Sequence, residues 1–83
     1  MATQFGGTPQ VKTRTAVLVF IKGASVPVVL YVENPQATYD ELQQLLKSPS
    51  SAVIEKEANG PIKKVTFQAS QVCAVAIQDE QYV

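Results

Sequence analysis

The chain has 83 residues, enough for one small domain that buries only about 60% of the surface its unfolded form exposes. Its seven basic and seven acidic residues cancel, which disfavours general nucleic-acid binding, because that binding needs a cationic excess. It has no histidine, one cysteine and no apolar run near the roughly 18 residues of a membrane span. We therefore expect a cytoplasmic protein with no membrane segment, cofactor, metal ion or internal disulfide.

The first third of the sequence predicts a tail followed by a β-hairpin. Residues 1–12 carry glycine and proline among small polar residues and are expected to form a flexible N-terminal tail. Thr13 to Lys22 is β-branched and apolar on both faces, which is typical of a strand. Gly23 to Ser25 predicts a turn, and Val26 to Glu33 a second strand. Pro27 lacks a backbone donor, so this second strand should lie at a sheet edge or have the position of the missing N–H facing outward.

A helix is predicted next, and two start signals compete for its first turn. Asn34 and Pro35 fit the cap and first-turn positions, whereas Thr38 and Glu41 have the spacing of a capping box. The helix is expected to end near Lys47, whose charge suits the C-terminal dipole. Its apolar stripe comprises Thr38, Tyr39, Leu42, Leu45 and Leu46.

Three further strands complete a β-β-α-β-β-β order and an α+β fold. The predicted elements are a strand from Ala52 to Glu57, a hairpin at Asn59-Gly60, a strand from Ile62 to Phe67, a short 3₁₀ turn over residues 68–71, and a strand from Val72 to Ile77. We expect one mostly antiparallel sheet with the single helix on one face. The domain is expected to cover residues 13–78, with residues 79–83 as a C-terminal tail.

The first and fifth predicted strands are apolar on both faces, which is typical of central strands that are covered twice. A single short helix can cover one face of the sheet and not two. The sequence therefore predicts a homo-oligomer, most simply a two-fold dimer with sheet faces in contact. The residues chosen for this oligomer or core face are Val17, Val19, Ile21, Val75 and Ile77.

For each side chain that could take part in catalysis or metal binding, we favour a purely structural interpretation. Cys73 lies between valine and alanine in a strand, and we expect a buried, unreactive thiol. Glu55 and Glu57 share a strand face and could act as paired carboxylates. Lysines across the predicted hairpin make cross-strand ion pairs the better interpretation.

Two possible binding surfaces remain open. Tyr31 and Tyr39 could line a pocket between the edge strand and the helix, and a cavity of at least about 300 Å³ would support it. Lys63 and Lys64 with Phe67 weakly suggest a base-stacking strand, although Phe67 shares its period with Val65 and is expected in the core.

Several short segments resemble a family of small uncharacterised proteins known mainly from cyanobacteria. They span about residues 14–78 and comprise Val26-Pro27-Val28, Tyr39-x-x-Leu42, Ile54-Glu55, Lys63-Lys64-Val65 and Ala69-x-x-Val72-x-Ala74-Val75. The resemblance implies a compact domain and no particular activity.

The favoured interpretation is a non-enzymatic, self-associating interaction or accessory domain. The alternatives are a small-ligand or regulatory binding module, an RNA-associated domain, and an enzyme built on Glu55 and Glu57.

Overall fold

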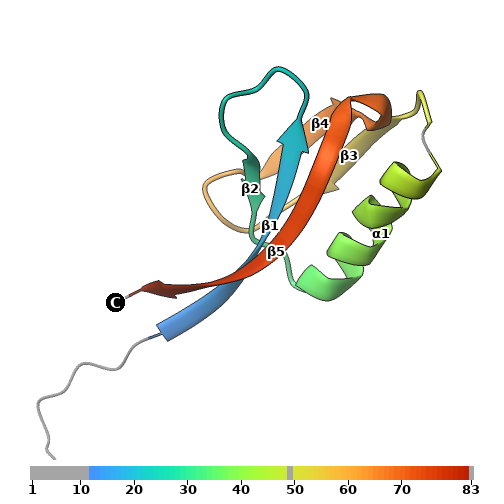
Figure 1. The fold of residues 1–83 in the computed structure, drawn as a ribbon. Coiled ribbons are helices and arrows are strands. Elements are labelled where there is room, and N and C mark those ends of the chain that lie inside the picture. Colours follow the sequence, from blue (N-terminus) through green and yellow to red (C-terminus); the bar gives the residue numbers. More distant parts are fainter. Residues whose placement is uncertain (1–11, 49, 83) are drawn as a thin grey trace, which may run out of the picture.

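The computed structural model describes residues 12–48 and 50–82, and these form an α+β fold with the predicted order of elements (Figure 1). The expected tail over residues 1–12 lies outside the described part except for Lys12. The elements are β1 (Lys12–Ile21), β2 (Val28–Leu30), α1 (Pro35–Lys47), β3 (Val53–Glu57), β4 (Lys64–Gln68), a 3₁₀ turn (Ala69–Gln71) and β5 (Val72–Tyr82).

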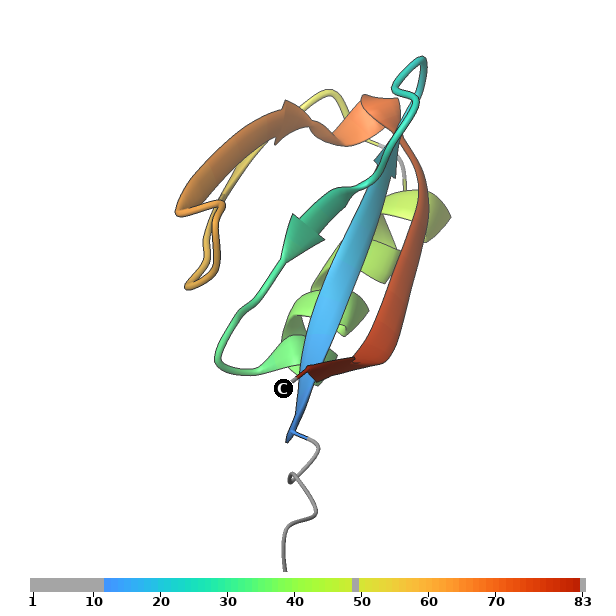
Figure 2. The same cartoon turned by 90° about the vertical axis from the view of Figure 1, so that its left-hand side faces the viewer.

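Three of the strands form an antiparallel sheet in the order β2-β1-β5, with β1 in the centre (Figure 2). The prediction that β2 lies at an edge is confirmed, and Pro27 directly precedes it. The expectation of a central position is confirmed for β1 and wrong for β5, which is the other edge strand. The apolar residues on both faces of β5 therefore do not mean that β5 has a paired strand along each of its two edges.

Helix α1 begins with the first of the two competing signals. The Asn34 side chain accepts a hydrogen bond from the backbone N–H of Ala37 at 3.1 Å, and Pro35 occupies the first helical position. Pro35 has no N–H to satisfy, so it fits the first turn without loss. On the inner face Leu42 is fully buried, whereas Leu46, expected in the apolar stripe, is 39% exposed.

Strands β3 and β4 form a separate two-stranded sheet instead of joining the first one. Val65 and Phe67 lie on the inner face and pack against the core, as predicted. Along both strands exposed residues alternate with half-buried ones, and the exposed residues form the outer face. Lys56 reaches helix α1 through an ion pair with Glu41. Helix and hairpin thus lie on the same side of the β2-β1-β5 sheet (Figure 1).

The hydrophobic core lies between this sheet and the helix with its neighbouring hairpin. Its buried residues are Val17, Val19, Leu30, Leu42 and Val72. Two of the residues selected from the sequence for the oligomer or core face, Ile21 and Val75, pack against it while remaining partly exposed. Since the strands contribute alternate residues to this core, the remaining alternate residues of β1, β2 and β5 point to the opposite face.

Strands β2 and β5 differ most in length from their predictions, for reasons visible in the pairing. Strand β2 ends at Leu30 because the next carbonyl, that of Tyr31, accepts a hydrogen bond from the backbone N–H of Asn59 at 2.6 Å. Strand β5 continues to Tyr82 because residues 78–82 pair with the first residues of β1. The segment predicted as a tail over residues 79–83 is therefore strand as far as Tyr82, and Val83 lies outside the described part.

Candidate functional site

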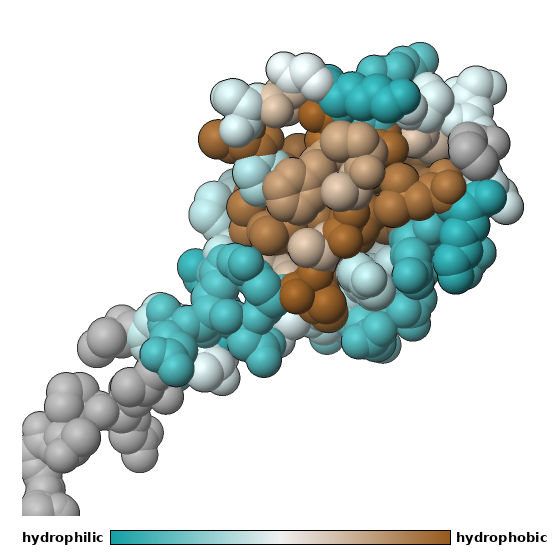
Figure 3. All heavy atoms as spheres, viewed as in Figure 1, coloured by the Kyte–Doolittle hydropathy of each residue, from teal (hydrophilic) through white to brown (hydrophobic). Residues whose placement is uncertain are grey.

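The side of the β2-β1-β5 sheet that faces away from helix α1 is the first candidate site. In the described part of the chain no helix or strand lies over it, and apolar side chains gather there (Figure 3). By the register of the ladders, the apolar part of this face, called the uncovered face below, comprises Ala16, Leu18 and Phe20 of β1, Val29 of β2, and Ala74 and Ala76 of β5. Toward the other end of the strands the same side of the sheet continues into Gln78 and the charged pair of Arg14 and Glu80.

The residues of the uncovered face differ in how much they remain exposed. Ala16 and Leu18 are already buried. Leu18 has a paired strand on each side, whereas Ala16 is paired with β5 alone. Phe20, Val29 and Ala76 are half-buried, and Ala74 is exposed. None of these six side chains carries a formal charge. The uncovered face is thus apolar and uncharged, but only moderately exposed.

The residues that the sequence analysis proposed for an oligomer or core face lie on the other side of the sheet. Val17 and Val19 are completely buried beneath the helix and the hairpin, and Ile21 and Val75 pack against the same core. Ile77 is half-buried and pairs with Val17. In this fold four of the five residues lie in the core or pack against it, and Ile77 is on the same side of the sheet by register. The face left open consists of their chain neighbours.

A β-bulge places Cys73 beside the uncovered face. The ladder between β1 and β5 shifts register at Phe20 and Ile21, which pair with Ala74 and Val72, so Cys73 is the extra residue. Its thiol is exposed and lies 3.4 Å from the carbonyl oxygen of Phe20. The prediction of a buried thiol is wrong, because simple alternation from Cys73 to Val75 does not hold across a bulge.

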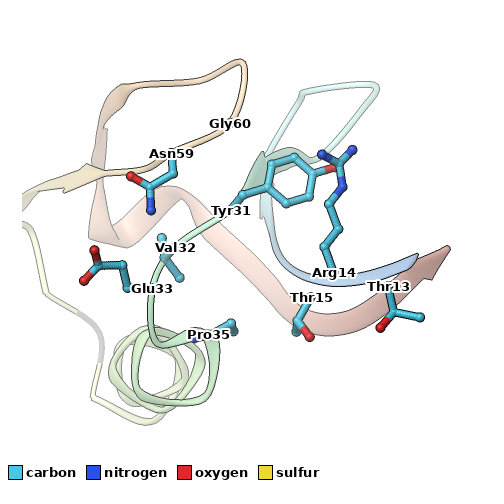
Figure 4. A pocket seen from close by; sticks show the side chains of 9 residues that line it. All are labelled: Thr13, Arg14, Thr15, Tyr31, Val32, Glu33, Pro35, Asn59 and Gly60. Carbon is cyan, nitrogen blue, oxygen red and sulfur yellow. The ribbon is translucent and has the colours of Figure 1, made fainter. Parts of the chain in front are cut away.

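A hollow with a volume of about 420 Å³ is the second candidate site (Figure 4). It lies where β1 and the chain after β2 move apart. Its walls come from β1, from the connection between β2 and α1 with the first residue of α1, and from the connection between β3 and β4. The lining residues are Thr13, Arg14, Thr15, Tyr31, Val32, Glu33, Pro35, Asn59 and Gly60. The expected pocket near Tyr31 is therefore present, but Tyr39 does not line it.

A cluster of polar side chains holds one wall of the hollow in place. The Tyr31 hydroxyl donates to Glu80 Oε1 at 2.7 Å, and Arg14 Nε donates to the same oxygen at 3.3 Å. The Arg14 guanidinium lies 4.0 Å from the centre of the Tyr31 ring and 5.2 Å from that of Tyr82. The second oxygen of Glu80 accepts from Gln78 at 3.0 Å. These contacts fix both Tyr31 and Arg14 at the rim.

The turn after β3 closes the hollow against Tyr31. A Cβ atom placed on Gly60 would overlap the Tyr31 ring, so only glycine permits this close approach of backbone and ring. The Asn59–Gly60 pair, predicted to form a tight hairpin turn, lies instead in a longer connection in which the N–H of Ala58 donates to the carbonyl of Lys63. Its function in the fold is to dock the second sheet on Tyr31.

The hydrogen bond between Tyr31 and Glu80 shifts both groups. It raises the pKa of Tyr31, with partial burial acting in the same direction. It lowers the pKa of Glu80, assisted by the hydrogen bond from Gln78. The neutral phenol and the charged carboxylate are therefore the forms that the folded state prefers.

Stability is expected to fall at both ends of the pH scale because of this pair. The lowered pKa of Glu80 contributes stability that is lost as pH falls below about 4, and the raised pKa of Tyr31 contributes stability that is lost as pH rises above about 10. Urea unfolding of the Tyr31→Phe variant should show shallower acid and alkaline decreases than the original protein. Tyr39→Phe, on helix α1 outside this cluster, is the control. Equal pH dependence in all three proteins would contradict the role of the pair.

The remaining candidates from the sequence are mostly engaged elsewhere. Glu55 pairs with Lys64 at 3.5 Å, as predicted, on the exposed face of β3 and β4. Glu57 lines a second hollow of about 390 Å³ near the start of α1, which Glu55 does not reach. Lys63 donates to the carbonyl of Asn59, and Phe67 packs against the core, so these residues form no common stacking surface.

Neither similarity to known proteins nor metal-ligand chemistry assigns a further site to this chain. No family model, curated protein or solved structure matches this chain. Within residues 12–48 and 50–82, no cluster of three side chains suited to metal binding is found. Helix α1, the one α-helix in that part, has 13 residues and is too short to cross a membrane.

Proposed function

We propose that this chain is a non-enzymatic interaction domain that self-associates through the uncovered face of its β2-β1-β5 sheet. The observation that carries the proposal is the lack of any described helix or strand over this face (Figure 1), on which apolar side chains gather (Figure 3). Two further properties support a second copy as the partner. In a two-fold dimer each residue lies near its own counterpart, and an uncharged patch avoids like-charge repulsion there. The zero net charge also lowers long-range repulsion between copies.

The size of the face sets the expected strength of the dimer. Three strands over five residues cover roughly 14 Å by 17 Å, which is well below the about 800 Å² per partner of a standard interface. Ala16 and Leu18 are already shielded in the monomer and contribute little on binding. We therefore expect weak association, with a dissociation constant on the order of 100 μM.

Sedimentation velocity over a concentration series tests whether the association occurs. The average mass should rise from one chain toward two between low micromolar and near-millimolar protein. A mass that stays at one chain over this range would overturn the proposal.

The single cysteine reports which surface is used. Cys73 is exposed beside Ala74 at the rim of the uncovered face. Its modification by a maleimide should slow as protein concentration rises, in parallel with the dimer fraction. A dimer in which Cys73 reacts as fast as in the monomer would place the contact elsewhere and reject this face.

A second candidate function is a small-ligand or regulatory binding module that uses the hollow beside Tyr31. The observation that favours it is the volume of about 420 Å³, which falls within the range of known ligand sites. Because the hollow and the uncovered face have largely separate residues, one chain could serve both functions. Both functions suit a cytoplasmic protein, the location in which an exposed thiol stays reduced.

A further inference from the structure

Strand β1 has an open edge over its first residues. It pairs with β5 from Lys12 to Ile21, but with β2 only from Val17 to Val19. In an antiparallel sheet every second residue of a strand directs both its N–H and its C=O group toward the same neighbouring strand. Among the residues that the structure describes, no strand meets the groups that residues 12–16 turn toward the β2 side. This stretch can therefore accept another extended chain.

The hollow of about 420 Å³ lies on this open side of β1 (Figure 4). One wall is the strand itself, from Thr13 to Thr15, and the opposite wall is the connection from Tyr31 to Pro35. Those two segments would have continued the β1–β2 ladder had the chain not turned toward Asn59. The hollow thus occupies the position that a paired strand would fill.

Arg14 supplies the one positive charge among the residues that line the hollow, and Glu33 lies on the opposite wall. Its Nε donates to Glu80, and its guanidinium is held against the Tyr31 ring, yet its side chain remains 46% exposed. A guanidinium has five N–H donors in a rigid fork, so most remain for a ligand. An arginine that is already positioned loses little side-chain entropy when it binds a carboxylate.

We propose that the hollow binds an extended peptide that carries an acidic side chain and adds as a short strand to the open edge of β1. The peptide backbone pairs with the stretch from Thr13 to Thr15, and its carboxylate binds Arg14. About three peptide residues would be paired within the hollow, because each faces one residue of β1. The partner is thus a flexible segment of another protein with a single carboxylate opposite Arg14, since Glu33 on the other wall would repel further negative charge. This inference rests on the second candidate function and is independent of self-association.

The test begins with a displayed library of random peptides selected on the full chain. Enriched sequences should combine β-branched residues with an acidic residue at one position. A synthetic peptide of the enriched sequence, titrated into labelled protein, should shift the amide resonances of Thr13, Arg14, Thr15 and Gly60. Its glutamate-to-glutamine form and the Arg14→Gln variant should each weaken binding about tenfold, the loss expected for one charge-assisted hydrogen bond.

Matched controls distinguish strand addition at β1 from non-specific binding. The Lys12→Gln variant removes a positive charge from the same strand outside the hollow and should bind like the original protein. A peptide with methylated backbone nitrogens should not bind, because it cannot pair with the strand. The peptide-side change uses the unaltered protein, so it remains informative if Arg14→Gln impairs folding.

The proposal is overturned by an absence of enrichment, by equal binding of the methylated peptide, or by shifts confined to Leu18, Phe20 and Ala76. That last pattern would mean that the peptide binds the uncovered face. Failure of self-association would appear in sedimentation alone and would leave the shifts near Arg14 unchanged, so the two proposals fail separately.

Discussion

The Leu42→Ala variant is expected to lose most of the stability of this domain. Leu42 is the one fully buried residue of helix α1, and it packs in the core with Val17, Val19 and Leu30. Removing a buried leucine side chain costs about 2–5 kcal/mol, because the lost contacts leave a cavity that refills only partly. Small domains have about 5 kcal/mol in total, so the variant should keep at most about 3 kcal/mol, and a loss at the upper end of this range would leave about half of the molecules unfolded.

Leu46→Ala provides a matched control for the Leu42 substitution. It makes the same change in the same helix, but Leu46 is 39% exposed and should cost less than about 1 kcal/mol. Urea unfolding of all three proteins, followed by circular dichroism at one protein concentration, measures the difference. Fixed concentration matters because self-association stabilises the folded state. Similar midpoints for the two variants would show that Leu42 is not the residue that joins helix and sheet.

The Ala76→Lys variant is expected to abolish self-association while leaving the fold intact. Ala76 is half-buried on the uncovered face and pairs with Leu18 of the central strand. A lysine there can extend into solvent in the monomer, but a two-fold dimer would bury two like charges close together. We expect the dissociation constant to rise at least about 100-fold, which corresponds to about 2.7 kcal/mol.

The control for Ala76→Lys is Val53→Lys, which adds the same charge elsewhere. Val53 is 64% exposed on the outer face of the second sheet, apart from the uncovered face. Sedimentation of Val53→Lys should match that of the original protein, apart from a small effect of net charge that salt removes. Equal loss of the dimer in both variants would indicate a general charge effect instead of a contact at Ala76.

Local sequence signals predicted the elements well because each depends on neighbouring residues. Asn34 and Pro35 set the start of the helix, and alternation along β3 and β4 predicted that Val65 and Phe67 face inward. The count of apolar strand faces against a single short helix also predicted that one face of the main sheet would lack a cover. It could not identify that face, because both sets of alternate residues in β1 are apolar and only the tertiary fold distinguishes them.

The errors of the sequence analysis arise where distant segments meet. The early end of β2 depends on the contact of Tyr31 with Asn59, and the extension of β5 depends on pairing with Lys12 to Ala16. The exposure of Cys73 depends on a bulge opposite Phe20. Arg14 and Glu80 were not singled out, although opposite charges near the two ends of a chain could have suggested a cross-strand pair.

The pairing of Lys12 with Tyr82 has a mechanical consequence. These residues are partners at one end of the ladder between β1 and β5, so the two ends of the described fold are adjacent. The hydrogen bonds of an antiparallel ladder run perpendicular to its strands. A pulling force applied at these two residues would therefore break the hydrogen bonds between β1 and β5 one after another, starting at the Lys12–Tyr82 end, and would not load all of them at once. Such a geometry yields at low force, which would let an unfolding protease or a translocation motor that grips either end dismantle the domain stepwise.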